Sequence, residues 1–225
     1  MASNMFLYWG SGSIPCWKPM LVLEEKGLSG YKNKRISFSD KEHKSEEITK
    51  LNPRGQVPTF KDGDVVVNES NAICFYLENK FPDKGTKLLT DDKAEFGRIV
   101  QRCAETANVH NTVNVNLAQY RLRTPKEKLD EELLQTKYEA VREELKLWEG
   151  YLAASGGYVV GSNFTMADVY FFPFVAFGVR LGLDLSKYPA TAAYYDKVKD
   201  RPSVKATWPP HWADGPGDTS IFGPV

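Results

Sequence analysis

Residues 5–27 read MFLYWGSGSIPCWKPMLVLEEKG, and this stretch says most about the fold. It opens with the apolar run 5–9, which is typical of a buried strand, and continues into a loop of glycine and serine. From Cys16 to Lys26 the apolar side chains recur at helical spacing, and Gly27 stands where a glycine commonly ends a helix. Pro19 is compatible only with the first turn of that helix. The stretch therefore predicts a strand, a loop and a helix that begins near Cys16.

Three further strands are predicted downstream. Residues 35–38 are a candidate second strand, which would complete a βαβ unit. Residues 57–61 and 65–67 flank Asp62-Gly63, a pair favoured at the head of two-residue hairpins. The last two strands are therefore expected to be antiparallel neighbours.

Short helices complete this half of the chain. Residues 45–51 carry a brief helical pattern, and a longer helix is expected over residues 71–81, capped by Ser70 and stopped by Pro82. The resulting order, βαβ followed by ββα, is that of a thioredoxin-like α/β domain, which we place at residues 1–84.

The rest of the chain has almost no strand signals. Residues 82–90 contain the helix breakers expected of a linker, and long helical patterns then occupy 91–120 and 125–154. Residues 165–168 (TMAD) fit a capping box ahead of an apolar helix. We therefore expect an all-helical second domain at residues 91–225.

The overall composition excludes several classes of protein. The chain has 225 residues, of which 42% are hydrophobic and 26% charged, a globular balance. Its 29 basic and 29 acidic residues produce no net field that would attract nucleic acid or an anionic membrane. The first residues lack the pattern of a secretory leader, and no apolar stretch is long enough to span a bilayer. We expect a cytoplasmic protein with no nucleic-acid or membrane partner.

Neither the cysteines nor the histidines are spaced as metal ligands. These residues are Cys16, Cys74, Cys103, His43, His110 and His211. An odd number of scattered cysteines also argues against a disulfide framework. Reduced thiols and no metal are expected, and no role is assigned to His110 or His211.

The loop between the first strand and helix is where a thioredoxin-like redox enzyme carries its CxxC motif. Here it reads Ser13-Ile14-Pro15-Cys16, with serine in place of the attacking cysteine. Dithiol exchange within this motif is therefore unavailable. A hydroxyl beside a helix N-terminus remains, and the unpaired N–H groups there favour an anion.

Two further segments suggest a peptide ligand. Residues 52–58 (NPRGQVP) lead into the third strand, and a cis Val57-Pro58 bond would expose the Val57 backbone to an extended ligand that pairs as an added strand. Glu69-Ser70 opens the helix after the hairpin, where N–H groups and the hydroxyl could receive a carboxylate. A plain helix cap is the simpler interpretation of that pair.

Together these motifs resemble the glutathione S-transferases over essentially the whole chain. The matching segments are SIPC (13–16), NPRGQVP (52–58), ESNAI (69–73), FTMAD (164–168) and RPS (201–203). The pattern is most similar to the rho class of aquatic animals, a serine-type class akin to theta and zeta, through WGSGS (9–13), EHKS (42–45) and WPP (208–210). The resemblance implies a glutathione-binding thioredoxin-like domain, an all-helical domain that forms most of the electrophile pocket, and a homodimer.

The resemblance also implies the contacts of glutathione, which would be a co-substrate. Val57 is expected to pair with its cysteinyl backbone, and Glu69 and Ser70 with its γ-glutamyl end. Either His43 or Lys44 is expected to hold the glycyl carboxylate. The remaining expected contacts are Gln56 and Pro58.

Ser13 is the expected partner of the glutathione thiolate. Ser11 is the alternative, because the repeated Gly-Ser pair leaves the register open by two residues. Cys16 would instead imply mixed-disulfide chemistry.

The electrophile pocket is predicted more loosely. Its expected lining is Tyr8, Val109, Thr112, Val113, Asn116, Tyr120 and Trp212. Core packing is the simpler interpretation of the stripe over residues 109–120, since apolar residues at helical spacing usually face a neighbouring helix. The asparagines of that segment, however, make it unusually polar for a core.

The expected activity is conjugation of glutathione to small hydrophobic electrophiles, with peroxide as a further acceptor, in detoxification. A noncatalytic ligand- or protein-binding module of the same fold is one alternative. A glutathione-dependent thiol transferase that uses Cys16 is the other.

Overall fold

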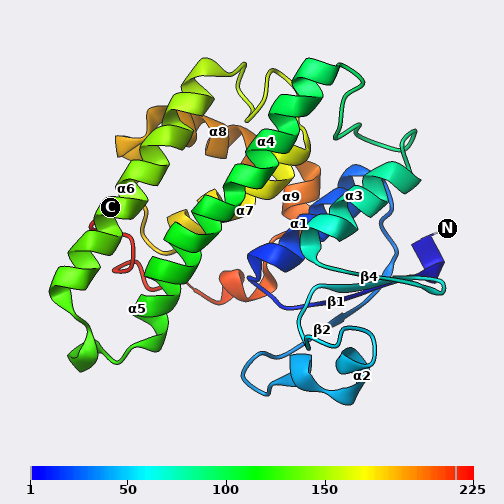
Figure 1. Cartoon of the computed structure of the whole chain (residues 1–225), viewed down its shortest axis with the longest axis horizontal. Helices are drawn as coiled ribbons and strands as arrows, with labels where there is room; N and C mark the ends of the chain where they lie inside the picture. The colour runs from blue at the N-terminus through cyan, green and yellow to red at the C-terminus, as the bar shows by residue number, and fades with distance from the viewer. Residues whose placement is uncertain (1, 216) are drawn as a thin grey trace. The chain divides into compact units, whose positions relative to one another are not determined.

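The computed structural model describes residues 2–215 and 217–225. The chain forms two compact units (Figure 1). The first consists of Met1–Lys87 and Pro202–Asp214, and the second of Leu88–Arg201 and Gly215–Val225. Residues 202–214, which the sequence suggested were part of the helical domain, therefore belong to the first unit.

The first unit contains a four-stranded sheet of order β2-β1-β3-β4. The strands are β1 (Met5–Trp9), β2 (Lys32–Arg35), β3 (Thr59–Asp62) and β4 (Val65–Asn68). β1 pairs in parallel with β2 and antiparallel with β3, and β3 pairs antiparallel with β4, which confirms the predicted βαβ and ββα order.

Two details of this sheet differ from the sequence prediction. β2 lies three residues earlier than residues 35–38, because this exposed edge strand pairs through its backbone and has no buried face to impose an apolar pattern. The hairpin turn is Gly63-Asp64 rather than Asp62-Gly63, since Asp62 still pairs with Val65. Gly63 has φ 60°, which suits the first central position of such a turn.

The helices of the first unit pack on the sheet and on one another. They are α1 (Ile14–Glu25), α2 (Glu46–Thr49), α3 (Ser70–Lys80) and α9 (Pro202–Thr207), with the 3₁₀ turns η1 (Ala2–Asn4), η2 (Glu42–Lys44) and η6 (Pro210–Asp214). α1 contacts both α3 and α9 (Figure 1).

Three tryptophans hold residues 202–214 in the first unit. Trp17 of α1 lies edge-on to Trp208 and Trp212, at ring-centroid distances of 5.4 and 5.5 Å. The Trp17 Nε1–H also donates to Oγ1 of Thr207 at 2.8 Å. Edge-to-face aromatic pairs add to the apolar area that they bury, so this cluster accounts for the position of α9 and η6.

The first unit also buries a charge pair between its helices. Nζ of Lys26, directly after α1, lies 2.5 Å from Oε2 of Glu78 on α3, with side-chain exposures of 0% and 6%. Glu25 accepts hydrogen bonds from Thr86 Oγ1 at 2.5 Å and from the Ser203 hydroxyl. These carboxylates join α1 to α3, to the segment after α3 and to α9.

In the described residues of the second unit, every regular element is a helix. A continuous helical run comprises α4 (Lys93–Val109), the π-helical segment η3 (His110–Gln119) and α5 (Tyr120–Arg123). The other elements are η4 (Lys126–Lys128), α6 (Glu131–Ala154), α7 (Met166–Arg180), η5 (Leu185–Lys187) and α8 (Pro189–Lys199). The predicted helices 91–120 and 125–154 are thus confirmed, with changed ends.

α7 is the buried centre of this unit. The predicted capping box is present: Asp168 accepts from the Thr165 N–H at 2.7 Å, and also from the Val159 N–H at 2.9 Å. Burial raises the pKa of the Asp168 carboxyl to about 6, although these donors act in the opposite direction. Phe171 of α7 stacks on Trp148 of α6 at 3.9 Å between ring centroids.

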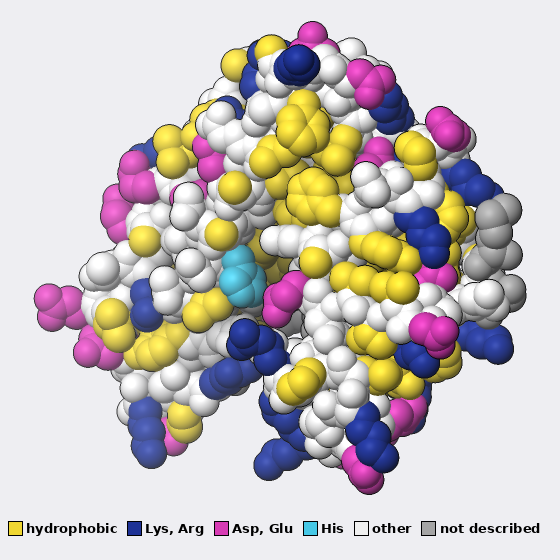
Figure 2. All heavy atoms as spheres, turned by 45° about the vertical axis from the view of Figure 1, so that its right-hand side comes forward, with side chains coloured by type: hydrophobic (Ala, Val, Ile, Leu, Met, Phe, Trp, Pro, Cys, Tyr) yellow, Lys and Arg dark blue, Asp and Glu magenta, His cyan; other side chains and the backbone are white. Residues whose placement is uncertain are grey.

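The surface carries no dominant charge on the face shown in Figure 2, where basic and acidic side chains are interspersed. Among residues 2–215 and 217–225, no helix combines the length and the apolar character needed to cross a bilayer.

Candidate active site

Ser13 forms the N-terminal boundary of α1. Its φ of −76° and ψ of 111° are those of a helix cap, and its Oγ accepts from the Cys16 N–H at 3.4 Å. α1 begins at Ile14, two residues earlier than predicted, because Ser13 caps it and Pro15 suits the first turn. The cap uses the Ser13 oxygen as an acceptor, so its O–H hydrogen can be donated elsewhere.

Cys16 is buried behind this loop. It is 1% exposed, and its Sγ accepts from the Gly10 N–H at 3.4 Å. Burial raises the pKa of the Cys16 thiol to about 11, against the lowering effect of the Ser13 and Gly10 contacts. A thiol of that pKa is neutral at pH 7, which argues against the thiol-transferase alternative.

The Val57-Pro58 peptide bond is cis. The preceding carbonyl, that of Gln56, accepts from Asn52 Nδ2 at 2.9 Å and from Thr59 Oγ1 at 2.8 Å, which holds the turn into β3. Within the described part of the chain, the backbone N–H and C=O of Val57 have no hydrogen-bond partner. These two groups can therefore pair with an added extended strand.

Glu69, not Ser70, occupies the cap position of α3. Its φ of 70° and ψ of 120° lie in a region that residues other than glycine rarely adopt. Ser70 is the first helical residue, and its Oγ lies 3.5 Å from Asn71 Oδ1. The Glu69 carboxylate is 4.0 Å from Nε of Arg54, with both side chains mostly exposed. Arg54, which had no predicted role, thus links residues 52–58 to the start of α3.

His43 and Lys44 lie side by side on η2, but their bonding differs. Lys44 Nζ donates to the Arg54 carbonyl at 3.0 Å. The His43 ring lies 5.6 Å from the exposed ring of Phe38. Its Nδ1 is buried, and no described residue hydrogen-bonds to it. The imidazole of His43 therefore has a ring nitrogen available for a hydrogen bond to a ligand, whereas the Lys44 ammonium already donates to the Arg54 carbonyl.

A second histidine lies at the loop before α1. The Oγ of Ser11 is 2.6 Å from Nδ1 of His211, which stands on η6. Between Ser11 and Ser13, Gly12 has φ 73°, and a Cβ there would lie 2.5 Å from Cε1 of His211. His211 is a functional candidate that the sequence did not reveal. No local pattern connects residues 200 positions apart.

Tyr8 is buried in a small core cluster with Ile36 and Ile48. Its hydroxyl donates to Oε1 of Glu47 at 3.0 Å, and burial raises the pKa of its phenol. The Tyr8 side chain is therefore bonded to α2, which favours core packing over a role in the electrophile pocket.

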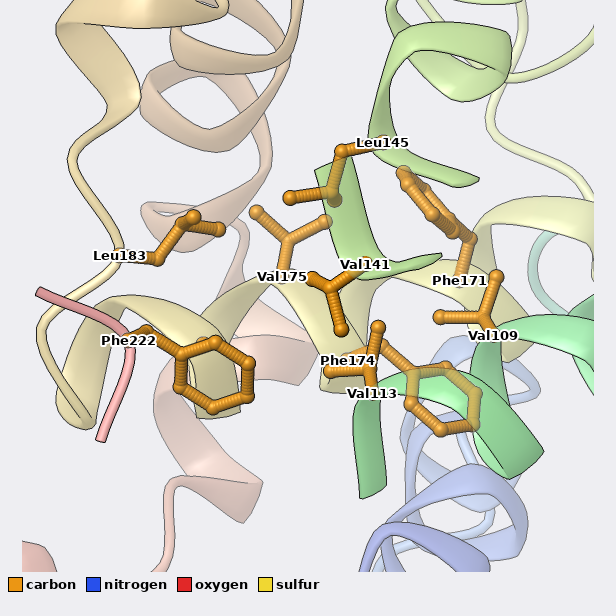
Figure 3. Close-up of a pocket in the computed structure, with 10 residues that line it drawn as sticks. Val109, Val113, Val141, Leu145, Phe171, Phe174, Val175, Leu183 and Phe222 are labelled. Atoms are coloured by element: carbon orange, nitrogen blue, oxygen red, sulfur yellow. The ribbon is translucent and has the colours of Figure 1, made fainter. Parts of the chain in front are cut away.

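Val109 and Val113 face the interior of the helical unit. They line a cavity of about 10 Å³, in which the surrounding side chains point toward one another (Figure 3). Its lining is apolar: Val109, Val113, Val141, Leu145, Phe171, Phe174, Val175, Gly178, Leu183 and Phe222. A cavity of this volume is too small for an organic ligand. The core interpretation is favoured for these two valines.

The other predicted pocket residues lie elsewhere. Thr112 is half-buried and Asn116 exposed on η3. The Tyr120 hydroxyl accepts from the Asp130 N–H at 3.1 Å, and Lys137 Nζ lies 5.0 Å from its ring, so Tyr120 joins α5 to α6. Trp212 belongs to the tryptophan cluster of the first unit.

In the described ranges, no group of three or more His, Cys, Asp or Glu side chains is arranged to hold a metal ion. The first unit is a thioredoxin-like domain that contains the serine loop before α1, the unpaired backbone groups of Val57 and the irregular start of α3.

Comparison with known proteins agrees with this class. The family model described as "Glutathione S-transferase, N-terminal domain" matches residues 3–79, and "Glutathione S-transferase, C-terminal domain" matches residues 113–202. "Glutathione S-transferase A" of Pleuronectes platessa is 45% identical over 217 residues, covering 96% of each chain.

Solved structures give the same result. The crystal structure of a glutathione S-transferase from the Antarctic clam Laternula elliptica has a TM-score of 0.90 at 50% identity and covers 98% of this chain and 99% of that one. A glutathione transferase from Phanerochaete chrysosporium in complex with oxidized glutathione has a TM-score of 0.80 at 26% identity, covering 92% and 95%. The chain belongs to the glutathione S-transferase family. It is thus a glutathione transferase, and glutathione is its co-substrate.

Proposed function

We propose that the protein binds glutathione along the open edge before β3, ionises its thiol, and transfers the thiolate to small hydrophobic electrophiles, with Ser13 as hydrogen-bond donor to the sulfur. The observation that carries the proposal is the position of Ser13, whose hydroxyl caps α1 through its oxygen and retains a hydrogen to donate. The N–H groups of the first turn of α1 add a favourable field for an anion.

The energy required is modest. A thiol with an ordinary pKa of about 8.5 is about 3% ionised at pH 7, whereas a pKa of about 6.5 makes it about three-quarters ionised. This shift corresponds to about 2.7 kcal/mol. One hydrogen bond to a charged acceptor and the helix N-terminus can together supply that amount.

Glutathione would be held by groups from three segments of the first unit. The free N–H and C=O of Val57 would pair with the cysteinyl residue, with Gln56 and Pro58 adjoining. Glu69 and Ser70 would hold the γ-glutamyl end, and the unusual backbone of Glu69 supports this role because such conformations concentrate at ligand sites. For the glycyl carboxylate His43 is favoured over Lys44, since Lys44 already bonds the Arg54 carbonyl.

The remaining parts of the proposal concern the acceptor and the assembly. Thr112, Asn116 and Trp212 remain candidates for the electrophile pocket. Peroxides are a second acceptor class, detoxification is the proposed role, and a cytoplasmic homodimer is the proposed form. The rho class is supported by segments 9–13, 42–45 and 208–210, and relatives from a fish and a marine clam agree with its described distribution.

The decisive experiment is binding to immobilised glutathione followed by conjugation to a small aryl halide across a pH series. Ser13→Ala should raise the kinetic pKa of bound glutathione by between about one and two units, because the helix N-terminus remains, and should lower turnover, with a smaller change in glutathione affinity. Ser13→Thr should restore much of the activity because it keeps a hydroxyl.

Ser13→Gly is the matched control, since glycine is tolerated at a helix cap at little cost but has no side-chain hydrogen to donate. Loss of activity in Ser13→Ala alone, with Ser13→Gly active, would make Ser13 a structural cap and not the thiolate partner. A wild-type protein that binds glutathione without conjugating any electrophile would instead support the noncatalytic module.

A further inference from the structure

The contact between Ser11 and His211 has the form of a proton-transfer pair. Their Oγ and Nδ1 atoms are 2.6 Å apart, a short hydrogen bond, and both residues belong to the first unit. Ser11 is half-buried and His211 is exposed, so one end of the pair faces the loop and the other has access to solvent. A hydroxyl beside an imidazole is an arrangement by which enzymes move protons.

The surroundings hold His211 in this position. Trp212 adjoins it in η6 and is packed edge-on against Trp17 and Trp208. Gly12 permits the close approach of the ring, because any Cβ at that position would collide with Cε1 of His211. The loop before α1 and the segment after α9 therefore fit together closely where Ser11 contacts His211.

The direction of the Ser11 hydrogen bond depends on the protonation of His211. A neutral imidazole with Nδ1 unprotonated accepts the hydrogen of the Ser11 hydroxyl. A protonated imidazole donates from Nδ1 to Oγ, and the Ser11 hydrogen can then be donated to another acceptor. Ser11 can thus bond a neutral thiol in the first state and a thiolate in the second.

We propose that His211 takes up, through Ser11, the proton that leaves the thiol of bound glutathione, and so acts as a positioning residue for thiolate formation. This inference rests on the proposed function, because it requires glutathione bound with its sulfur beside residues 11–13. Ser13 and the start of α1 stabilise the thiolate, whereas Ser11 and His211 provide the destination of the proton.

The step balances in protons and electrons. The S–H bond breaks, its electron pair stays on sulfur, and its proton bonds to Oγ of Ser11. The former hydroxyl proton of Ser11 bonds to Nδ1 of His211. The products are a thiolate, a neutral Ser11 hydroxyl that donates to it, and an imidazolium. After the conjugate leaves, the exposed imidazolium returns its proton to solvent.

The test is His211→Asn in the full-length protein. An asparagine amide can hydrogen-bond Ser11 from about the place of Nδ1 but cannot take up a proton. The pKa of the thiol of bound glutathione, followed through the ultraviolet absorbance of the thiolate, should rise by about one unit. At pH values below that pKa, the variant should therefore contain about tenfold less thiolate than the wild type. The glutathione dissociation constant should change little.

Proton release separates a relay from a structural role. Calorimetry of glutathione binding in buffers of different ionisation enthalpy gives the protons released per thiolate formed. That ratio should be near zero in the wild type and near one in His211→Asn. His110→Asn, which alters the half-buried histidine of η3, is the matched control and should leave both the pKa and the ratio unchanged.

Ser11→Ala provides an independent variant in case substitution of His211 disturbs η6. It should produce the same shift, and the double variant should shift the pKa no further, because the two residues act as one unit. If the wild type ionises glutathione and His211→Asn has the same pKa and the same proton release, the relay is overturned but the proposed function stands. A wild-type protein that does not ionise glutathione would contradict the proposed function itself.

Discussion

The polar groups of the candidate site in the first unit differ from the buried carboxylate at the centre of the second unit. In the first unit, the candidate site consists of half-buried or exposed side chains at the ends of elements, and the backbone there is irregular. Both non-glycine residues of the described chain with left-handed φ, Lys41 and Glu69, belong to it. In the second unit, the buried polar group Asp168 is fully bonded within an aromatic core.

This difference indicates that the irregular segments of the first unit bind the ligand, whereas Asp168 and the aromatic core stabilise the second unit. Irregular backbone and uncommitted polar atoms, such as those of Val57 and His43, are what a ligand can bind. A satisfied buried carboxylate and close-packed rings contribute stability to the unit that contains them.

The largest effect is expected at the buried ion pair of the first unit. Glu78→Ala leaves the Lys26 ammonium buried without its partner, which should lower the free energy of unfolding by about 4 kcal/mol. Chemical denaturation measures this. The double variant Lys26→Met with Glu78→Leu should recover most of the loss, because no charge is then left buried. If Glu78→Ala were as stable as the wild type, the ion pair would make no contribution to the stability of the first unit.

The next effect concerns Asp168 and pH. Its folded pKa of about 6 lies above the ordinary value of 3.8, so its contribution to stability is fully present below about pH 4 and is lost as pH rises through 6. The wild-type free energy of unfolding, measured relative to that of Asp168→Asn, should fall by about 3 kcal/mol between pH 3 and 8. Asparagine does not titrate, and the other carboxylates cancel in the difference. A constant difference would contradict the raised pKa.

A smaller effect distinguishes core from pocket on η3. Val113→Ala removes two buried methyl groups beside the apolar cavity and should cost about 2 kcal/mol of stability. Val115→Ala, two residues away and 41% exposed, is the control and should change stability by less than about 0.5 kcal/mol. If Val113→Ala left stability unchanged and altered electrophile affinity, the pocket interpretation would be restored.

The smallest effect is an expected lack of reaction. Cys16, Cys74 and Cys103 are all buried, and burial raises the pKa of the Cys16 thiol to about 11 and that of Cys74 to about 12. The native protein should therefore resist alkylation at pH 7, whereas the denatured chain should react at all three positions. Mass spectrometry after iodoacetamide treatment tests this. Rapid modification of Cys16 in the folded protein would reopen the thiol-transferase alternative.

Much of the fold could be read from the sequence where the signal is local. The strand at 5–9, the hairpin, the Thr165 capping box and the serine hydroxyl beside the start of the first helix depend on neighbours a few residues apart. The errors fell where local chemistry is ambiguous. The edge strand β2 buries no side chain, and Glu69 takes a cap position that residue preferences assign to serine.

The sequence by itself determined the thioredoxin-like order of elements, the helical second unit and the serine at the start of α1, because each follows from periodicity or from hydrogen bonds between near neighbours. Only the tertiary structure decided that Val109 and Val113 are buried beside an apolar cavity, and that His211 contacts Ser11. Apolar residues have the same helical spacing whether they line a core or a pocket. The contact between Ser11 and His211, which are 200 residues apart, depends on the tryptophan cluster that packs residues 202–214 against α1.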